Sequence, residues 1–238
     1  MHENKFSSSN INREYEMMKN VHSSYTVSAL NYFETEYWKC LVMPAYLDGD
    51  AFTLIEKDET NEQIVKQIIY DVIKGLTYLE SEHIIHHDIK PENLFLYKKD
   101  KITHALIGDF EYAEITSDEN EERRGTLLYS APEILNGSPY SYNSDMWSVD
   151  VSMTVLLTHL IPFYGKRKEQ ILKEIFRRRI TLPRKFSEEA QDLLDKLLCI
   201  DPKDRILAAE ALQHPWFNDV EELNDDTQNP EIDEQSNN

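Results

Sequence analysis

Glycine is scarce in this sequence, with six in 238 residues, and the first of them is Gly49. Backbone that turns tightly or approaches a phosphate closely needs glycine, so residues 1–48 contain no glycine-rich phosphate-binding loop. Cysteine is scarcer still. Cys40 and Cys199 lie far apart within apolar runs, which argues against a disulfide framework and indicates core residues of a reduced, intracellular protein.

Long apolar segments are also missing. The longest stretch, residues 147–160, is too short to span a bilayer and is interrupted by Asp150, so it predicts a buried helix. Residues 1–20 are polar and lack the apolar core of a signal peptide. We therefore expect no membrane association and a cytoplasmic location, with access to the nucleus left open.

Basic residues are outnumbered, because 25 Lys and Arg stand against 44 Asp and Glu, for a net charge of −19. Phosphate backbones bind basic surfaces, so this balance argues against nucleic acid and disfavours anionic membranes. It favours basic partners or substrates. The apolar fraction of 40% and the charged fraction of 29% are ordinary for a soluble globular protein.

Hydrophobic periodicity predicts a mixture of helices and short strands. A first helix starts near Ser9 or Asn10, and the strongest helical pattern lies at residues 61–82. Residues 44–50, which begin with Pro44, form a connector between two parts of the chain. Further predictions are strands at 25–33, 37–43, 84–85, 94–96 and 105–107, and helices at 147–160, 169–178, 188–198 and 208–212.

The chemistry concentrates in the loop that runs from His86 to Asn93. Asp88 supplies a carboxylate, Lys90 a cation and Asn93 a hard oxygen ligand, all within six residues. Asp109 follows sixteen residues after Asn93, behind a predicted strand, and offers a second carboxylate. Phosphoryl transfer needs an oriented hydroxyl, a cation near the transferred group, and oxygens that hold Mg²⁺.

Three motifs occur in the order and spacing of the eukaryotic protein-kinase signature: His86-His87-Asp88 with Lys90 and Asn93, then Asp109-Phe110, then Ala131-Pro132-Glu133. From residue 14 to residue 217 the chain resembles a serine/threonine protein kinase. The resemblance implies an α+β, two-lobed fold with a mostly helical large lobe and an incomplete small lobe of one helix and two strands. The implied segments are a flexible N-terminus (1–10), a partial small lobe (11–43), a hinge (44–50), the large catalytic lobe (51–217) and an acidic, disordered tail (218–238).

The resemblance also implies a role for each motif residue. Asp88 resembles the catalytic base, Lys90 the lysine that contacts the γ-phosphate of ATP, and Thr126 the threonine that positions the substrate. Asn93 and Asp109 resemble the Mg²⁺ ligands. The residues that match the nucleotide-binding positions of the family are Glu14, the gatekeeper Met43, Pro44 and Tyr46 of the hinge, Asp50 and Phe95.

Other matches are structural. Asp145 resembles the buried aspartate that braces the catalytic loop, and Arg205 resembles the arginine that pairs with Glu133. His214-Pro215-Trp216-Phe217 is similar to the end of calmodulin-dependent-type kinases. A zinc cluster of the three nearby histidines is the alternative for this loop, although their spacing does not match His-Glu-x-x-His.

The sequence departs from the family pattern at several places. The strand lysine that pairs with the helix glutamate is missing together with the glycine loop. His87 stands where the family has arginine, and Glu111 and Asp150 stand where it has glycine. Acidic residues crowd the loop after Thr116 and Ser117, so we expect that neither is an activating phosphosite.

Three functions follow from these matches and departures. The leading one is a protein kinase that uses ATP and Mg²⁺ to phosphorylate Ser and Thr of protein substrates, with the start of its small lobe not in this sequence. A regulatory protein partner or a longer chain would supply that part. The alternatives are a pseudokinase that acts as a scaffold and an inactive kinase fragment.

Overall fold

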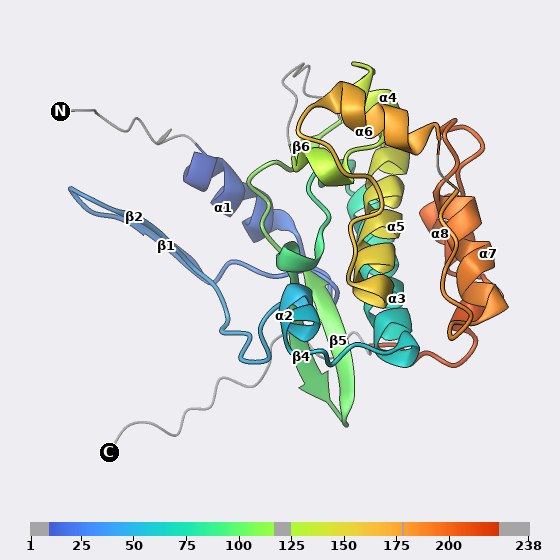
Figure 1. Ribbon diagram of the computed structural model, residues 1–238. Helices are drawn as coiled ribbons and strands as arrows, with labels where there is room; N and C mark the ends of the chain where they lie inside the picture. The colour runs from blue at the N-terminus through green and yellow to red at the C-terminus, as the bar shows by residue number, and fades with distance from the viewer. Residues whose placement is uncertain (1–9, 117–124, 178, 224–238) are drawn as a thin grey trace.

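The computed structural model describes residues 10–116, 125–177 and 179–223. It shows a mostly helical body and a hairpin that projects away from it (Figure 1). This mixture of helices and strands matches the α+β fold expected from the sequence, with a helical large lobe and few strands in the small lobe.

The centre of the body consists of α3 (Glu62–Ser81) and α5 (Tyr142–Thr158). Asn61 caps α3 by accepting a hydrogen bond from the N–H of Ile64 at 3.0 Å. Almost every residue of α5 is buried, as expected for a helix enclosed on all sides. None of the described helices combines the length and apolar character needed to cross a membrane.

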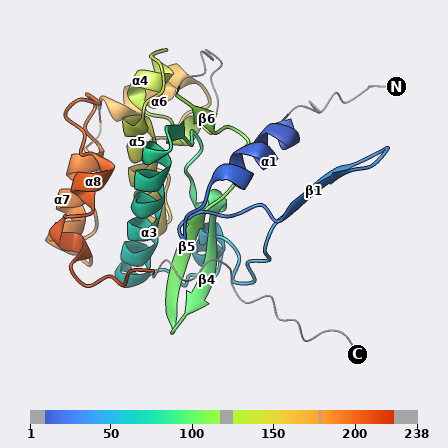
Figure 2. The same cartoon turned by 180° about the vertical axis from the view of Figure 1, so that it is seen from behind.

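Smaller elements surround these two helices, as the front and back views show (Figures 1 and 2). The helices α7 and α8 lie to one side, and α4 and α6 lie near the N-terminal end of α5. A hairpin of β4 and β5 packs against α3. The bounds of these elements are Glu188–Leu197 (α7), Ala208–Ala211 (α8), Pro132–Leu135 (α4), Lys168–Ile175 (α6), Leu94–Lys99 (β4) and Ile102–Ile107 (β5).

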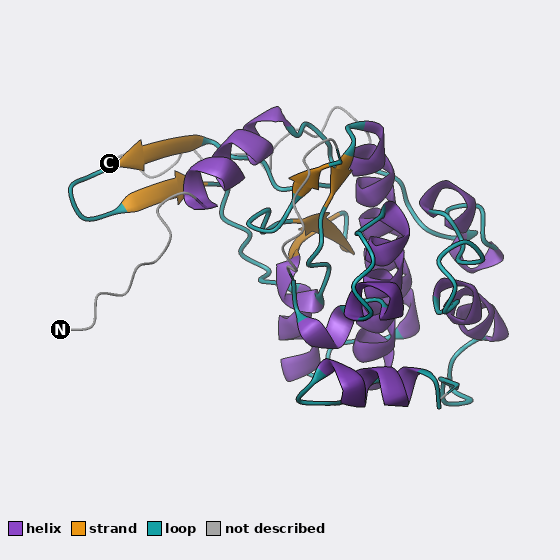
Figure 3. Ribbon diagram, turned by 90° about the horizontal axis from the view of Figure 1, so that it is seen from above, coloured by secondary structure: helices purple, strands orange, loops and turns teal. Residues whose placement is uncertain are grey.

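The small-lobe part consists of α1 (Asn10–Asn20) and a hairpin of β1 (Asn31–Glu34) and β2 (Lys39–Val42). Seen from above, the hairpin extends beyond the body beside α1 (Figure 3). The predicted strand at residues 25–33 is too long. Its first part instead pairs with the end of β5, where the N–H of Val27 donates to the carbonyl of Ile107 at 2.8 Å.

Two further segments differ from the prediction. A short helix, α2 (Ala51–Glu56), follows the connector because Asp50 caps its first turn. Residues 218–223, predicted as part of a disordered tail, run along α3. Lys66 pairs with Asp219 at 2.8 Å, and Leu223 is buried. The burial of Leu223 and these polar contacts offset the conformational entropy that the segment loses when it is ordered. The rest of the predicted tail lies outside the described residues.

Asp150 is a buried acid inside α5, at a position for which the sequence offered no explanation. Its side chain is fully buried, Oδ1 has no hydrogen-bond partner among the described residues, and Oδ2 accepts only a long contact of 3.5 Å from Thr154. Burial holds the pKa of Asp150 well above its ordinary value. The folded protein therefore binds a proton at this carboxyl more tightly than the unfolded chain does.

Asp150→Ala is expected to raise the free energy of unfolding by about 1–3 kcal/mol at neutral pH, since a buried group with poor partners is removed. The unfolded chain releases the proton above the ordinary pKa, so stability from this group falls as pH rises. The difference between variant and wild type should therefore grow with pH. Urea denaturation at several pH values measures it, and exposed Glu210→Ala is the control. A variant less stable than wild type at every pH would contradict the expectation.

Candidate active site

Asp88 lies at the centre of a compact group of polar side chains. Lys90 Nζ donates to Asp88 Oδ2 at 2.6 Å, and Asn93 Nδ2 donates to the same oxygen at 3.0 Å. The N–H of Thr126 donates to Oδ1 at 2.7 Å, while its hydroxyl lies 3.0 Å from Lys90 Nζ. Three predicted site residues, Asp88, Lys90 and Thr126, are thus in direct contact, although 36 residues separate Lys90 from Thr126.

The carboxylate of Asp88 is ionised and covered. Burial alone raises its pKa, but the hydrogen bonds and charge of Lys90 and the contact with Thr126 outweigh it, so the pKa lies below its ordinary value. Burial likewise opposes the charge of Lys90, yet Asp88 keeps the pKa of this lysine above its ordinary value. The side chain of Asp88 is only 1% exposed. A hydroxyl can reach it only after Lys90 or Thr126 moves.

Asp145, in α5, anchors the start of the loop 86–93, as its position in the sequence predicts. Its two carboxylate oxygens accept the N–H groups of His86 and His87 at 2.8 and 2.9 Å. Burial is the main reason that its pKa rises to about 7. His86 is fully buried against Phe110, and its Nε2 lies 3.0 Å from the carbonyl of Gly108. Burial lowers the pKa of His86 to about 4, so the ring is neutral and structural.

Asn93 and Asp109 belong to neighbouring segments, because the N–H of Gly108 donates to the carbonyl of Asn93 at 2.9 Å. The amide nitrogen of Asn93 is engaged by Asp88, which leaves its amide oxygen available. Asp109 is half-buried and adopts a left-handed backbone with φ of 59°. An amide oxygen and a carboxylate fit Mg²⁺, which is commonly bound by one or two protein ligands together with substrate phosphates.

Comparison with known proteins decides the family. The family model described as "Protein kinase domain" matches residues 1–217. The chain belongs to the protein kinase family.

Relatives of this kinase domain carry the names of several kinases. It is 32% identical over 215 residues to "Myosin light chain kinase A" of Dictyostelium discoideum, covering 87% of this chain and 73% of that protein. It is 36% identical to "Calcium-dependent protein kinase 3" of Plasmodium berghei and 31% identical to "Aurora kinase" of Saccharomyces cerevisiae. In both cases 86% of this chain is covered, but only 38% and 56% of the relative's length.

Part of the predicted nucleotide site lies in and around residues 44–50, the segment predicted as the hinge. Met43, Tyr46 and Phe95 are half-buried and pack on the core, with the rings of Tyr46 and Phe95 5.7 Å apart. Burial raises the pKa of Tyr46 to about 12. Among the described residues, none bonds to the Pro44 carbonyl or the Tyr46 N–H, and both residues are predicted for the nucleotide site.

Asp50, predicted for the nucleotide site, also has a structural role. Its Oδ1 accepts hydrogen bonds from the N–H and the hydroxyl of Thr53, at 2.8 and 2.9 Å, and so caps α2. The sequence signal for this cap was present, because Asp is one of the preferred N-cap residues. Oδ2 of Asp50 has no hydrogen bond recorded within the described part of the chain.

Glu14 of the kinase domain lies beside Asp109 and Glu111, with no ion pair to a basic side chain in the described ranges. Burial, followed by the charges of Asp109 and Glu111, raises the pKa of Glu14 to about 7, against a hydrogen bond from the N–H of Phe110 that lowers it. Glu111 itself is accommodated without a left-handed backbone. The bulk expected from this substitution therefore does not strain the chain at that residue.

Glycines hold the segments of the site close together. Gly125 has a φ of +85°, and an added Cβ would lie 2.2 Å from the carbonyl oxygen of His87. Sequence reasoning missed Gly108, where a Cβ would lie 2.5 Å from the ring of Phe95. Its position directly before Asp109 was the available signal. Gly125 thus lets its segment approach the backbone of the catalytic loop, and Gly108 leaves room for the ring of Phe95.

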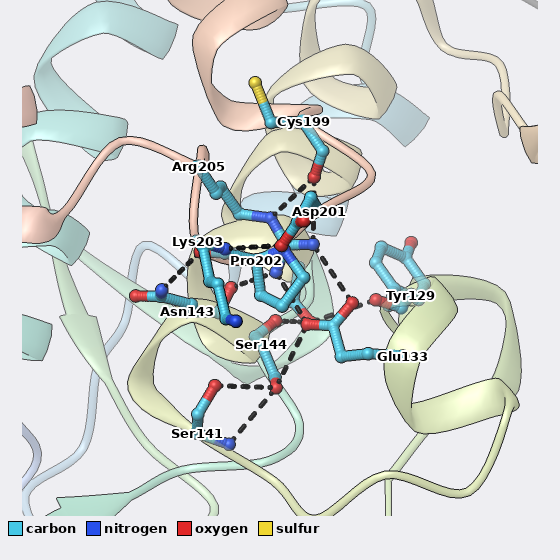
Figure 4. A network of polar contacts seen from close by, with 11 residues as sticks. Tyr129, Glu133, Ser141, Asn143, Ser144, Cys199, Asp201, Pro202, Lys203 and Arg205 are labelled. Atoms are coloured by element: carbon cyan, nitrogen blue, oxygen red, sulfur yellow. Dashed lines mark hydrogen bonds and ion pairs between the residues drawn. The ribbon is translucent and has the colours of Figure 1, made fainter.

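The segment that carries Thr126 is fixed at its far end by a buried ion pair, as predicted (Figure 4). Arg205 Nη1 and Nη2 lie 2.7 and 3.0 Å from the two carboxylate oxygens of Glu133, at the start of α4. The guanidinium also donates to the carbonyl of Cys199. A hydrogen bond of 2.9 Å from Ser148 to the carbonyl of Tyr129 attaches the segment to α5.

Thr116, the last described residue before residue 125, is exposed. Ser117 and the acidic residues after it lie outside the described residues, so the expectation about phosphorylation there stays a prediction.

His87, which stands where the family has arginine, is buried. Its ring packs against the ring of Tyr140 with centroids 4.0 Å apart, and its Nε2 lies 4.0 Å from a carboxylate oxygen of Glu114.

Proposed function

We propose that this chain is the catalytic domain of a serine/threonine protein kinase that transfers the γ-phosphoryl group of ATP to protein hydroxyls. The observation that supports it most is the contact of Asp88, Lys90 and Thr126 in one group. A lysine two residues after the aspartate is typical of serine/threonine kinases, and the relatives' names agree with that class. A cytoplasmic location with nuclear access remains part of the proposal.

Asp88 accepts the proton of the substrate hydroxyl in this proposal. Its lowered pKa keeps it ionised at neutral pH, so it orients the hydroxyl first and takes the proton as the bond to phosphorus forms. Lys90 then offers its charge to the transferred group. Thr126 fixes the distance between the substrate segment and Asp88, which is a positioning role.

Asn93 and Asp109 are proposed to hold Mg²⁺, and Met43, Pro44, Tyr46, Phe95 and Asp50 to line the nucleotide site. Bound Mg²⁺–ATP supplies the phosphoryl group and neutralises its oxygens. The donor set of one amide and one carboxylate suits an ion that takes its remaining ligands from phosphates and water.

A binding module without turnover is the second candidate, and one observation favours it. Glu14 lies beside two other acids and is half-protonated near neutral pH, because the described part of the chain supplies it with no cation. A partner or a further segment that brings a lysine to Glu14 would restore the arrangement expected of an active kinase.

Nucleotide binding is the first property to test. Wild-type protein should be stabilised by Mg²⁺ and ATP together, by about 2.7 kcal/mol when the nucleotide is at 100 times its Kd. Asp109→Asn is expected to abolish the Mg²⁺-dependent part of this stabilisation, since it removes the charged metal ligand. Thermal unfolding followed by fluorescence, with ATP alone, Mg²⁺ alone and both, measures the effect.

The matched control is Asp100→Asn, an exposed acid in the turn between β4 and β5. It should respond to Mg²⁺ and ATP like the wild type. No shift of the wild type at millimolar nucleotide would overturn the proposal that this chain binds ATP on its own. An undiminished shift in Asp109→Asn would remove Asp109 from the metal site.

A further inference from the structure

Positive charge is concentrated in one segment of this acidic protein. Residues 166–185 contain nine of its 25 Lys and Arg but only two of its 44 Asp and Glu, a net charge of +7 in a chain of −19. This basic segment comprises α6 and most of the connection to α7. Its exposed described members are Lys166, Arg167, Lys173, Arg177, Arg179, Arg184 and Lys185.

A groove of about 610 Å³ lies against this segment, at the C-terminal end of α5. One wall is the basic segment, which contributes Arg179, Ile180, Thr181, Pro183 and Lys185. The end of α5 and the residues after it contribute Thr154, Leu157, Thr158, His159, Leu160, Ile161 and Pro162, and the remaining lining residues are Asp58 and Thr60. The volume is in the range of pockets that bind drug-sized ligands.

The groove combines cations with apolar surface. Leu160 is 69% exposed at its edge, and Ile161 and Pro162 line it further along. Two more large apolar side chains, Tyr164 and Phe176, are exposed on the flanking segments. Large exposed apolar side chains beside charged ones mark contact surfaces.

The nearby acids do not neutralise the groove. Arg179 pairs with Asp195, but its side chain remains 78% exposed. Asp58 is the one acid among the lining residues, and it lies 3.8 Å from Nδ1 of His159, whose Nε2 contacts the Thr60 hydroxyl at 2.6 Å. Lys185 makes no ion pair with a described residue, and its Nζ lies over the ring of Phe186 at 4.8 Å.

We propose that this groove is a docking site for an acidic peptide segment of a partner protein, with an apolar side chain next to its carboxylates. Arg179 and Lys185 bind the carboxylates, and the Leu160–Pro162 wall takes the apolar side chain. Charge complementarity selects this occupant, because other acidic surfaces of the protein repel the same peptide. The site is separate from Asp88, so the inference does not depend on catalysis.

Nucleic acid fits the groove less well. A duplex or a single strand extends beyond one groove, and it would meet the negative potential that the rest of this chain carries. A short acidic segment contacts only the positive region. The apolar wall also has no counterpart on a phosphate backbone.

The test uses a fluorescein-labelled peptide of alternating Glu and Leu, with a Gln–Leu peptide of equal length as the uncharged control. Fluorescence anisotropy should show that the wild-type protein binds the acidic peptide and not the uncharged one, more weakly as salt increases. Arg179→Glu with Lys185→Glu should weaken binding at least about tenfold, since two attractive pairs become repulsive. Lys98→Glu with Lys101→Glu, on β4 and its turn, changes the net charge equally and should leave binding unchanged.

Thr181→Trp keeps the charge and fills the groove, so it should also weaken binding; circular dichroism shows whether each variant is folded. Equal loss in the Lys98/Lys101 variant would overturn the proposal, because binding would then follow net charge alone. Tighter binding of a single-stranded oligonucleotide or of anionic vesicles through the same two residues would also overturn it. So would a wild-type protein that does not bind the acidic peptide.

Discussion

Asp88→Asn is expected to lower the rate of peptide phosphorylation by about 10²–10⁴-fold, the usual contribution of a positioned general base. Asparagine has a single acceptor oxygen, so it can accept a hydrogen bond from Thr126 or from Lys90 but not from both, and it cannot take the substrate proton. It also leaves Lys90 without the carboxylate that lies 2.6 Å away. Transfer of labelled phosphate from ATP to a serine peptide, at saturating nucleotide, measures the effect.

The comparison is with Asp100→Asn, which makes the same carboxylate-to-amide change in an exposed turn and should retain wild-type rates. Thermal unfolding shows whether Asp88→Asn is folded, and Mg²⁺–ATP should still stabilise it. Equal rates in wild type and Asp88→Asn would show that Asp88 is not the base. If the wild type binds Mg²⁺–ATP without transferring phosphate, the module without turnover becomes the better description.

Arg205→Ala is expected to lower the free energy of unfolding by about 3–5 kcal/mol, the usual cost of removing one partner of a buried ion pair. The side chain of Arg205 is fully buried and makes two hydrogen bonds to Glu133. It also lies against the ring of Trp147, at 5.2 Å. Its loss leaves the carboxylate of Glu133 buried and without its cation, and chemical denaturation measures the difference.

Arg179→Ala provides the matched comparison, because its ion pair with Asp195 is largely exposed and should contribute little to stability. A second variant, Arg205→Met with Glu133→Leu, removes both charges and should recover much of the lost stability. A loss in Arg205→Ala no larger than that in Arg179→Ala would mean that the buried pair does not stabilise the fold.

The long helices could be predicted because one physical signal dominates each of them. Residues 61–82 carry an apolar stripe with a capping asparagine in front, and α3 spans Glu62–Ser81. The short elements could not be predicted equally well. The β-branched residues around Val27 read as a long strand, but their hydrogen bonds go to Ile107, which lies far along the chain. Tertiary contacts of this kind override local propensity.

The candidate site was predictable to the extent that its residues occur in an ordered set of motifs. The positions of Asp145 and Arg205 followed from that order, and both make the predicted contacts. The order of the motifs did not predict which residues are buried, or the electrostatic interactions between residues far apart in the sequence. Burial, and then two acids almost a hundred residues away, raise the pKa of Glu14. The cover over Asp88 depends on a backbone N–H of Thr126, whose direction no residue type specifies.

The contact of Thr126 with Asp88 and Lys90 has a consequence for substrate recognition. Under the proposed function, the chain holds Thr126 against Asp88 and Lys90 at a fixed effective concentration, so this threonine must shift before it can position an incoming hydroxyl. A substrate that must displace it binds with an affinity reduced by the fraction of molecules in which the contact is open. Under the proposed function, a weak substrate leaves the site occupied by the chain's own threonine. Segments that bind strongly elsewhere on the surface, and so gain a high local concentration, are the ones that reach Asp88.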